Sequence, residues 1–281
     1  MTAISTVPAG TAVAAPRPRL LATWATLARR RIMLSAHTPR EVLAPLVTPL
    51  LFALVIAPAL ATMIPGGADY STFVIVGTVG LLIPLTCTFA GIGVIVDRAA
   101  GARRELLAAP IQRSLIVLGN MAVAIAVSLL QVSVLILAGW ARGSHFHGTT
   151  AGIGWFLGAV LTFTVFMYAV AEILANRIPT QEEYVGLTPV VAILPWFLAG
   201  SLFPITALPG WLAAVARVLP TTHALALLRY GVLGHGGTGL HDIWGVGSTT
   251  AAAALSLLVL AAWAAVATAV AIRVFKRSAV H

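Results

Sequence analysis

Residues 97–114 read DRAAGARRELLAAPIQRS and carry six charged side chains within 18 positions. On each side of this segment the chain runs for more than twenty residues without a charged side chain. Two apolar runs separated by a short charged loop are typical of a membrane hairpin whose loop lies outside the lipid. So compact a charged segment also predicts a docking surface for a partner rather than a plain tether.

The composition of the whole chain indicates a membrane protein. Of its 281 residues, 59% are hydrophobic and 9% are charged, and the mean hydropathy is +0.99. The chain has too few polar residues to cover such a core in water, so lipid must cover it. A segment in lipid has to satisfy its own backbone hydrogen bonds, which favours helices. We therefore expect an all-α membrane protein with a single transmembrane domain over residues 1–281.

Six apolar stretches are long enough to cross a hydrocarbon core of about 30 Å at about 1.5 Å per helical residue. Prolines and glycines concentrate in the first, second and fifth of them, which favours a bundle that moves or lines a path. The sixth is rich in alanine and free of proline, as expected for a straight packing helix. The predicted transmembrane helices are residues 42–63, 71–96, 115–138, 152–175, 185–205 and 249–272.

The distribution of Lys and Arg predicts the orientation. Fourteen of the 17 basic residues fall on one side of this topology, and only Arg142, Arg217 and Arg229 fall on the other. Cytoplasmic loops are enriched in Lys and Arg, so both termini are predicted to be cytoplasmic. Arg217 and Arg229 are expected at or above the outer head groups, because a deeper charge costs at least about 2.5–3.5 kcal/mol. The net charge of +9 therefore indicates topology and anionic lipid, not a nucleic-acid partner.

Two further segments lie outside the spans. Residues 1–18 are rich in Ala, Thr and Pro and are predicted to be a disordered cytoplasmic tail. Residues 19–36 place apolar side chains at helical spacing beside an arginine cluster, which predicts a helix lying in the cytoplasmic head groups with Trp24 at the interface. The alternative is a plain juxtamembrane anchor.

The outer segment between the last two spans, residues 205–248, is apolar but interrupted at Pro209, Pro220 and Gly234. Each piece has about ten residues, which is too short to cross the bilayer. We expect a re-entrant helical hairpin that dips into the outer leaflet and returns.

No catalytic motif is present. The sequence lacks H-E-x-x-H and G-x-S-x-G, and its single lysine, Lys276, is followed by Arg277, so it has no G-K-[ST] phosphate loop. The chain is therefore expected to have no ATPase site and to bind no cofactor. Cys87, in the second span, is interpreted as a small apolar filler.

Two other groups of polar residues invite a functional interpretation. Glu172 lies near the end of the fourth span, and an interfacial carboxylate at the cytoplasmic head groups is favoured over a role with protons or substrate. Four histidines fall on the outer side at loose spacing, and no metal site is expected from them. They are His145, His147, His235 and His241.

Two stretches carry a resemblance. The run DRAAGARRELLAAPIQRSLIVLGN resembles the cytoplasmic loop of ABC-2 type permeases, in which an acid, a glycine, a Leu-Leu pair, a proline, an arginine and a glycine recur. The run FLAGSLFPITALPGWLAAVARVLPTTHALALLRYGVLG is similar to the closing signature of that family, and the likeness is greatest to its daunorubicin-resistance exporters. One position departs from the pattern: Leu228 stands where the family has an acid beside Arg229, which removes an expected ion pair. The matching residues are Asp97, Gly101, Leu106, Leu107, Pro110, Arg113 and Gly119 in the first run, and Phe203, Pro204, Leu208, Pro209, Gly210, Trp211 and Pro220 in the second.

The resemblance implies the transmembrane subunit of an ATP-driven exporter in the plasma membrane of a prokaryote. Two permease subunits, identical or paralogous, would pair within the lipid, and each would dock a separate ABC ATPase subunit that holds ATP and Mg. Its cargo would be a hydrophobic or amphipathic compound, drug-like or lipid. The implied ATPase-coupling residues are Asp97, Gly101, Arg104, Glu105, Leu106, Leu107, Pro110 and Arg113. The implied outer gate comprises Phe203, Pro204, Pro209, Trp211, Pro220 and Arg229.

Three alternatives stay open at this point. An ion-coupled secondary carrier would normally show buried acids or internal repeats, and neither is apparent in the sequence. An ABC permease for a polysaccharide or a lipid-linked glycan would have the same layout with another cargo. A membrane-embedded enzyme would need a catalytic set, which the motif search does not find.

Overall fold

The computed structural model describes residues 20–37, 39–63, 67–108, 111–233 and 238–278, and every element in them is helical. The first half of the chain contains α1 (Leu20–His37), α2 (Pro39–Leu51), the π-helix η1 (Phe52–Ile56), α3 (Ala57–Ala61), α4 (Gly67–Ala99), α5 (Ala102–Ala108) and α6 (Arg113–Ala141). The second half contains α7 (Thr150–Arg177), α8 (Gln181–Gly186), the π-helix η2 (Pro189–Ile193), α9 (Leu194–Leu198), the 3₁₀-helix η3 (Ile205–Ala207), α10 (Gly210–Val218), α11 (Pro220–Leu233), α12 (Thr238–Trp244) and α13 (Thr249–Ser278).

Five helical runs in the described residues are long and apolar enough to cross a membrane, or six if the bent pair α10–α11 counts as one span. Helix α4 is the central helix, because 72% of its most apolar window is buried within the bundle, against 22% for α13. The five runs match the predicted spans one, two, three, four and six, and α13 is continuous, as expected for a packing helix. They are Val42–Ala61, Tyr70–Ala99, Arg113–Ala141, Thr150–Arg177 and Thr249–Ser278.

The predicted fifth span, residues 185–205, is wrong as a single helix. The chain passes from α8 into the π-helix η2, and α9 already ends at Leu198. Gly200, with a φ of +80°, then turns the chain in a conformation that glycine adopts readily. The short pieces are held on α4, because the Trp196 indole is buried and donates a 2.8 Å hydrogen bond to the carbonyl of Gly77.

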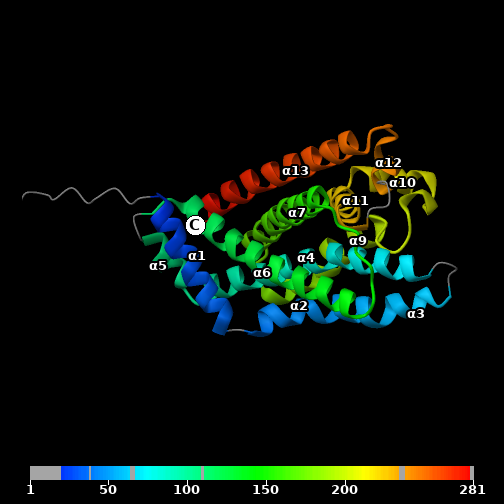
Figure 1. Cartoon of the computed structure of the whole chain (residues 1–281). Coiled ribbons are helices and arrows are strands. Elements are labelled where there is room, and N and C mark those ends of the chain that lie inside the picture. The colour runs from blue at the N-terminus through cyan, green and yellow to red at the C-terminus, as the bar shows by residue number, and fades with distance from the viewer. Residues whose placement is uncertain (1–19, 38, 64–66, 109–110, 234–237, 279–281) are drawn as a thin grey trace, which may run out of the picture.

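The two ends of the bundle are formed by different sets of helices. Helices α1 and α5 and the end of α13 gather at one end, which we call the inner end (Figure 1). Helices α10, α11 and α12 gather at the opposite, outer end (Figure 1). The segments that the positive-inside argument assigns to the cytoplasm therefore share one end of the bundle.

The outer segment forms two helices of contrasting environment. Helices α10 and α11 meet at an 80° bend around Leu219. On α10, Trp211 is 71% exposed and Val218 is 64% exposed, whereas α11 is buried over most of its length. The two-piece arrangement was predicted, but α11 packs among the long helices instead of lying freely in the outer leaflet.

Helix α1 covers the range predicted for an interfacial helix and packs against α6. The Trp24 indole donates a 3.2 Å hydrogen bond to the carbonyl of Leu118. Leu21 is 81% exposed, and Arg29 and Arg30 are also exposed. Arg31 differs from its neighbours, because it is turned into the bundle. Residues 1–18, predicted to be a disordered tail, lie outside the described residues.

Candidate functional site

The charged segment at 97–114 forms a tight turn and a short helix at the inner end. Helix α4 ends at Ala99, and Gly101 follows with a φ of +78° before α5 begins at Ala102. A side chain at this φ is strained, because its Cβ crowds the next carbonyl oxygen. The glycine that the family resemblance singled out therefore has a backbone reason to be there.

Asp97 is held by an arginine that the sequence did not assign to the site. Its carboxylate forms an ion pair with the Arg31 guanidinium of α1 at 3.1 Å. The Asp97 side chain is 26% exposed and the Arg31 side chain is 10% exposed. Gly93 lies one helical turn before Asp97, and a Cβ on it would collide with the Arg31 guanidinium. Helix α1 is thus bound to the end of α4 by a partly buried charge pair.

Two further arginines bind this segment to other helices. Arg98 donates to the carbonyl oxygens of Ala175, Ile178 and Pro179 at 2.9, 2.7 and 2.9 Å. These carbonyls belong to the last turn of α7 and its exit, where helix ends leave acceptors unpaired and cations are favoured. Arg113, at the start of α6, donates to the carbonyl of Lys276 near the end of α13 at 3.4 Å.

The apolar part of α5 faces its own protein. Leu106 is half-buried and packs against the main hydrophobic core, while Glu105 is exposed. Only part of the Leu106 side chain is therefore accessible to a partner. Pro110 lies outside the described residues, as do the side chains of Arg104 and Leu107.

Glu172, predicted as an interfacial carboxylate near the cytoplasmic head groups, lies inside the protein. It is 1% exposed, and it accepts hydrogen bonds from the Tyr168 hydroxyl at 2.7 Å and the Asn176 amide at 2.9 Å. The same Asn176 accepts a 3.2 Å bond from Ser278 at the end of α13. The carboxylate is therefore a buried, hydrogen-bonded group that helps to join α7 to α13.

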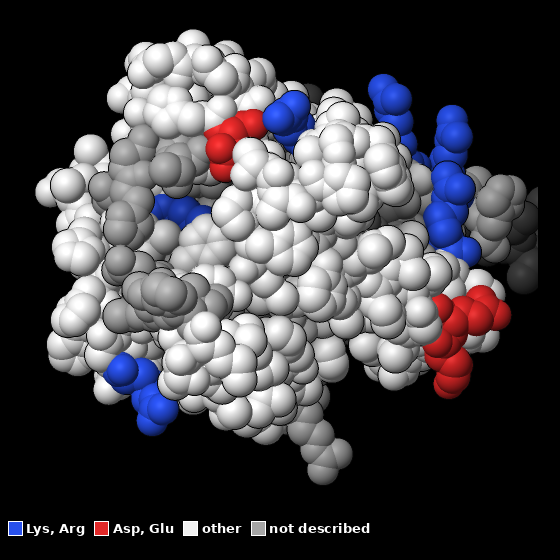
Figure 2. All heavy atoms as spheres, turned by 90° about the vertical axis from the view of Figure 1, so that its right-hand side faces the viewer, with Lys and Arg blue, Asp and Glu red and all other residues white. Residues whose placement is uncertain are grey.

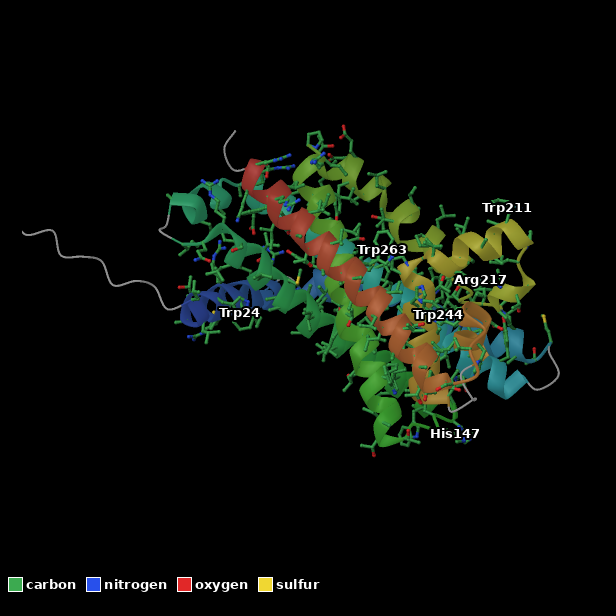
Figure 3. The ribbon with its side chains drawn as sticks, turned by 90° about the horizontal axis from the view of Figure 1, so that it is seen from above. Trp24, His147, Trp211, Arg217, Trp244 and Trp263 are labelled. Carbon is green, nitrogen blue, oxygen red and sulfur yellow. The ribbon has the colours of Figure 1, made fainter. Side chains whose placement is uncertain are left out.

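The outer-gate residues are spread over the turn, α10 and α11. Phe203 and Pro204 are exposed in the turn that follows α9, and Pro209 directly precedes α10. Pro220 is the buried first residue of α11. Figure 3 shows Trp211 at the outer extremity, far from Trp24 on α1.

Arg229 is partly buried and its Nε is fully buried, whereas the Arg217 side chain is exposed. Arg229 donates to the carbonyls of Gly200 and Ser201 at 2.8 and 2.7 Å, and its Cζ lies 3.4 Å from the centre of the Phe73 ring. No carboxylate of the described residues forms an ion pair with it, in agreement with the leucine found at 228. Carbonyls and an aromatic face thus replace the expected acid.

Within the described part of the chain, no three His, Cys, Asp or Glu side chains come together as metal ligands. His145 and His147 are exposed, and His235 lies outside the described residues. Cys87 is fully buried in the core.

Comparison with known proteins shows which family the chain belongs to. The model of the ABC-2 type transporter family matches residues 23–233, which include both the charged inner segment and the outer turn. The chain belongs to the ABC-2 type transporter family. It is thus a multi-pass protein of the cell membrane, and it is the membrane subunit of an ABC transporter, which works with an ABC ATPase subunit.

Individual ABC-2 relatives have low sequence identity to this chain, but the similarity extends over half of its length or more. The chain is 26% identical to Nodulation protein J of Neorhizobium galegae over 78% of this chain and 84% of that protein. It is 24% identical to the Daunorubicin resistance ABC transporter permease protein DrrB1 of Streptomyces coeruleorubidus over 82% of each. It is 28% identical to the Putative transport permease ycf38 of Porphyra purpurea over 50% of this chain and 48% of that protein.

Sequence reasoning missed several residues that the structure brings into these sites. Arg31 belongs to the arginine cluster of the predicted interfacial helix, and nothing in its local sequence distinguishes it from Arg29 and Arg30. Arg98 was counted only for topology. For Arg31, the available signal was Gly93, because a glycine in a long helix often marks the close approach of another group.

Proposed function

We propose that this ABC-2 permease exports a hydrophobic or amphipathic compound and that the segment at 97–114 is where the ATPase docks. The observation that supports it best is the way this segment is anchored. Asp97, Arg98 and Arg113 join it to α1, α7 and α13 by side-chain bonds. A force applied to this one segment therefore acts on three other helices at once.

The coupling step follows from those bonds. ATP and Mg bind to the partner subunit, and closure of two ATPase subunits moves the two docked segments together. Each segment draws on α1 through the Arg31–Asp97 pair and on α7 through Arg98. Because α4 is the central helix and continues directly into the segment, the displacement reaches the outer end along α4.

The outer gate lies at the outer end of α4, to which the displacement of α4 is transmitted. Helix α4 contributes Phe73 beneath Arg229, and the carbonyl of Gly77 accepts the bond from Trp196. Movement of α4 therefore acts on the turn at 199–204 and on α11. In this proposal the gate residues open the outer end to release cargo and close it afterwards, in a dimer of two permease subunits.

The nature of the cargo rests on two considerations. The long helices carry few charged groups that a hydrophilic cargo could use, and the relative DrrB1 is named for daunorubicin resistance. An aromatic, drug-like amphiphile or a lipid fits both. A secondary carrier stays the rival function, and Glu172 is the buried acid among the described residues that it could use.

The test is co-purification followed by transport. A tagged permease expressed with its candidate ATPase should retain that ATPase in detergent, and ATP hydrolysis by the complex should rise when daunorubicin or another amphiphile is added. Inverted vesicles with the complex should accumulate the compound only with ATP. A partner whose Walker lysine is replaced should still co-purify but not transport. Transport that follows an imposed proton gradient without ATP would instead establish the carrier.

A further inference from the structure

The outer end contains a partly open cavity of about 310 Å³ between α4, α11, α12 and the turn after α9. Figure 2 views this end of the molecule, where most atoms are uncharged and basic atoms lie recessed in a hollow. Ligand pockets in proteins span about 300–1,000 Å³, so this cavity suits a head group or small fragment better than a whole drug-sized molecule.

The cavity wall carries one cation and one anion. Arg229 lines it from α11, and Asp242 lines it from α12. The two do not form an ion pair with each other, and the Arg229 guanidinium meets only carbonyls and the Phe73 ring among the described residues. The cavity therefore presents two charges of opposite sign that do not neutralise each other by contact.

Two donors on the same wall have no hydrogen-bond partner in the described part of the chain. They are the Nε of Arg229 and the Oγ1 of Thr222, and both atoms are buried. Buried polar groups of native proteins are nearly always paired. Both atoms are closed off from the cavity, so a ligand there would meet the other nitrogens of Arg229, the Asp242 carboxylate and the apolar and aromatic side chains of Phe73 and Tyr230.

We propose that this cavity binds a zwitterionic phospholipid head group of the phosphoethanolamine class. The phosphate would lie against Arg229, because a guanidinium recognises phosphate oxygens well. The ammonium would lie toward Asp242 and the Tyr230 ring, which attract cations. This goes beyond the export function, because binding is a property of the permease alone and needs neither ATPase nor cargo.

The test measures binding to the purified permease by calorimetry in an uncharged maltoside detergent. The probes are dihexanoyl-phosphatidylethanolamine, the anionic dihexanoyl-phosphatidylglycerol and neutral dihexanoylglycerol. We expect the first to bind best. Arg229→Gln should weaken it about ten- to hundredfold, the range for loss of a hydrogen bond to a charged group. Asp242→Asn should weaken phosphatidylethanolamine but not phosphatidylglycerol.

Arg142→Gln is the matched control, because this exposed arginine also lies at the outer end and does not line the cavity. It should leave all three affinities unchanged. Equal binding of dihexanoylglycerol and phosphatidylethanolamine to the wild type would overturn the site. So would unchanged affinity in Asp242→Asn, a change at a partly exposed position that decides the matter even if Arg229→Gln does not fold. Preference for phosphatidylglycerol would overturn the zwitterionic assignment.

Discussion

Gly101 shows how one residue sets the shape of the inner segment. Its φ of +78° lets the chain leave α4 and enter α5 within two residues, and no neighbouring atom would touch a Cβ placed there. Any penalty for a side chain at this position is therefore backbone strain and not a clash.

We predict that Gly101→Ala lowers the free energy of unfolding by about 1–2 kcal/mol, the cost of a left-handed conformation at a non-glycine residue. In a protein of this size that corresponds to a fall in Tm of about 2–8 °C. Thermal unfolding in detergent measures it, and ATPase co-purification should fall with it. Gly154→Ala is the control, because Gly154 is exposed on α7, has no atoms near its Cβ position and has an ordinary φ. An equal effect at both positions would contradict the strain argument.

The Arg31–Asp97 pair makes a second prediction at this scale. Arg31→Gln, Asp97→Asn and the double variant should form a double-mutant cycle with a coupling energy of about 1–3 kcal/mol in unfolding, as for contacting residues in one network. Arg30→Gln with Asp97→Asn is the matched control, because Arg30 is exposed and forms no ion pair with Asp97. A coupling near zero for the Arg31 cycle would mean that the pair contributes nothing to holding α1.

The charges and the glycine of this segment were predictable from the sequence, but their partners were not. Asp97, Gly101 and Arg113 stood out because they occupy a charged island between apolar runs. That Arg31 and not Arg30 would reach Asp97 depends on the rotation of α1 about its axis. That rotation is set by packing of α1 on α6, where Gly119 admits the Leu27 side chain, and the local pattern of apolar residues does not specify it.

At the scale of elements, α5 presents one side to the bundle and one to the outside. Leu106 packs inward, so Leu106→Asp would bury a charge and report on folding instead of docking.

The exposed Glu105 is the better probe of docking. We predict that Glu105→Arg reduces ATPase co-purification several-fold while Tm stays unchanged. Arg142→Glu reverses a charge at the outer end, where Arg142 is also exposed, and should leave co-purification intact. Loss of the ATPase in both variants would indicate a general charge effect.

The turn at Gly200 offers the matching test at the outer end. A Cβ there would lie 2.8 Å from Ile205 Cγ2 and 3.0 Å from the carbonyl of Phe203, in addition to the strain of a φ of +80°. We predict that Gly200→Ala slows ATP-dependent export in vesicles but leaves ATPase co-purification at the wild-type level. Gly101→Ala should lower ATPase co-purification and, because export depends on the docked ATPase, export as well. Identical losses of both functions in the two variants would argue against separate coupling and gate regions.

Five of the six spans followed from hydropathy because each is one continuous apolar helical run, although the first includes a π-helical segment. The fifth did not, because residues 185–205 are just as apolar while their backbone is interrupted. Pro189 and Pro195 each remove a backbone donor, and Gly200 reverses the chain. Hydropathy measures whether a segment prefers lipid, not whether its helix continues. The buried α11 has a similar explanation, since an apolar piece of this length can lie in lipid or in a protein core.

For the whole molecule, the separation of the two ends is the feature on which the mechanism depends. The inner end gathers α1, α5 and the end of α13, and the outer end gathers α10, α11 and α12 (Figure 1). The described chain begins with α1 at the inner end and returns to that end along α13. If that end faces the cytoplasm, the docking segment meets the ATPase and the lipid-binding cavity faces outward.

We predict that, in a Cys87→Ala background, Ala108→Cys is shielded from an impermeant thiol reagent in intact cells and Gly148→Cys is labelled. Both positions are exposed and lie at opposite ends, and Cys87 is buried, so its removal leaves surfaces unchanged. The physical reason is the excess of Lys and Arg at the end that carries Ala108. Permeabilised cells provide the control, because both cysteines should then react. Labelling of Ala108→Cys in intact cells, with Gly148→Cys protected, would invert the topology and place the proposed docking segment where no ATPase could reach it.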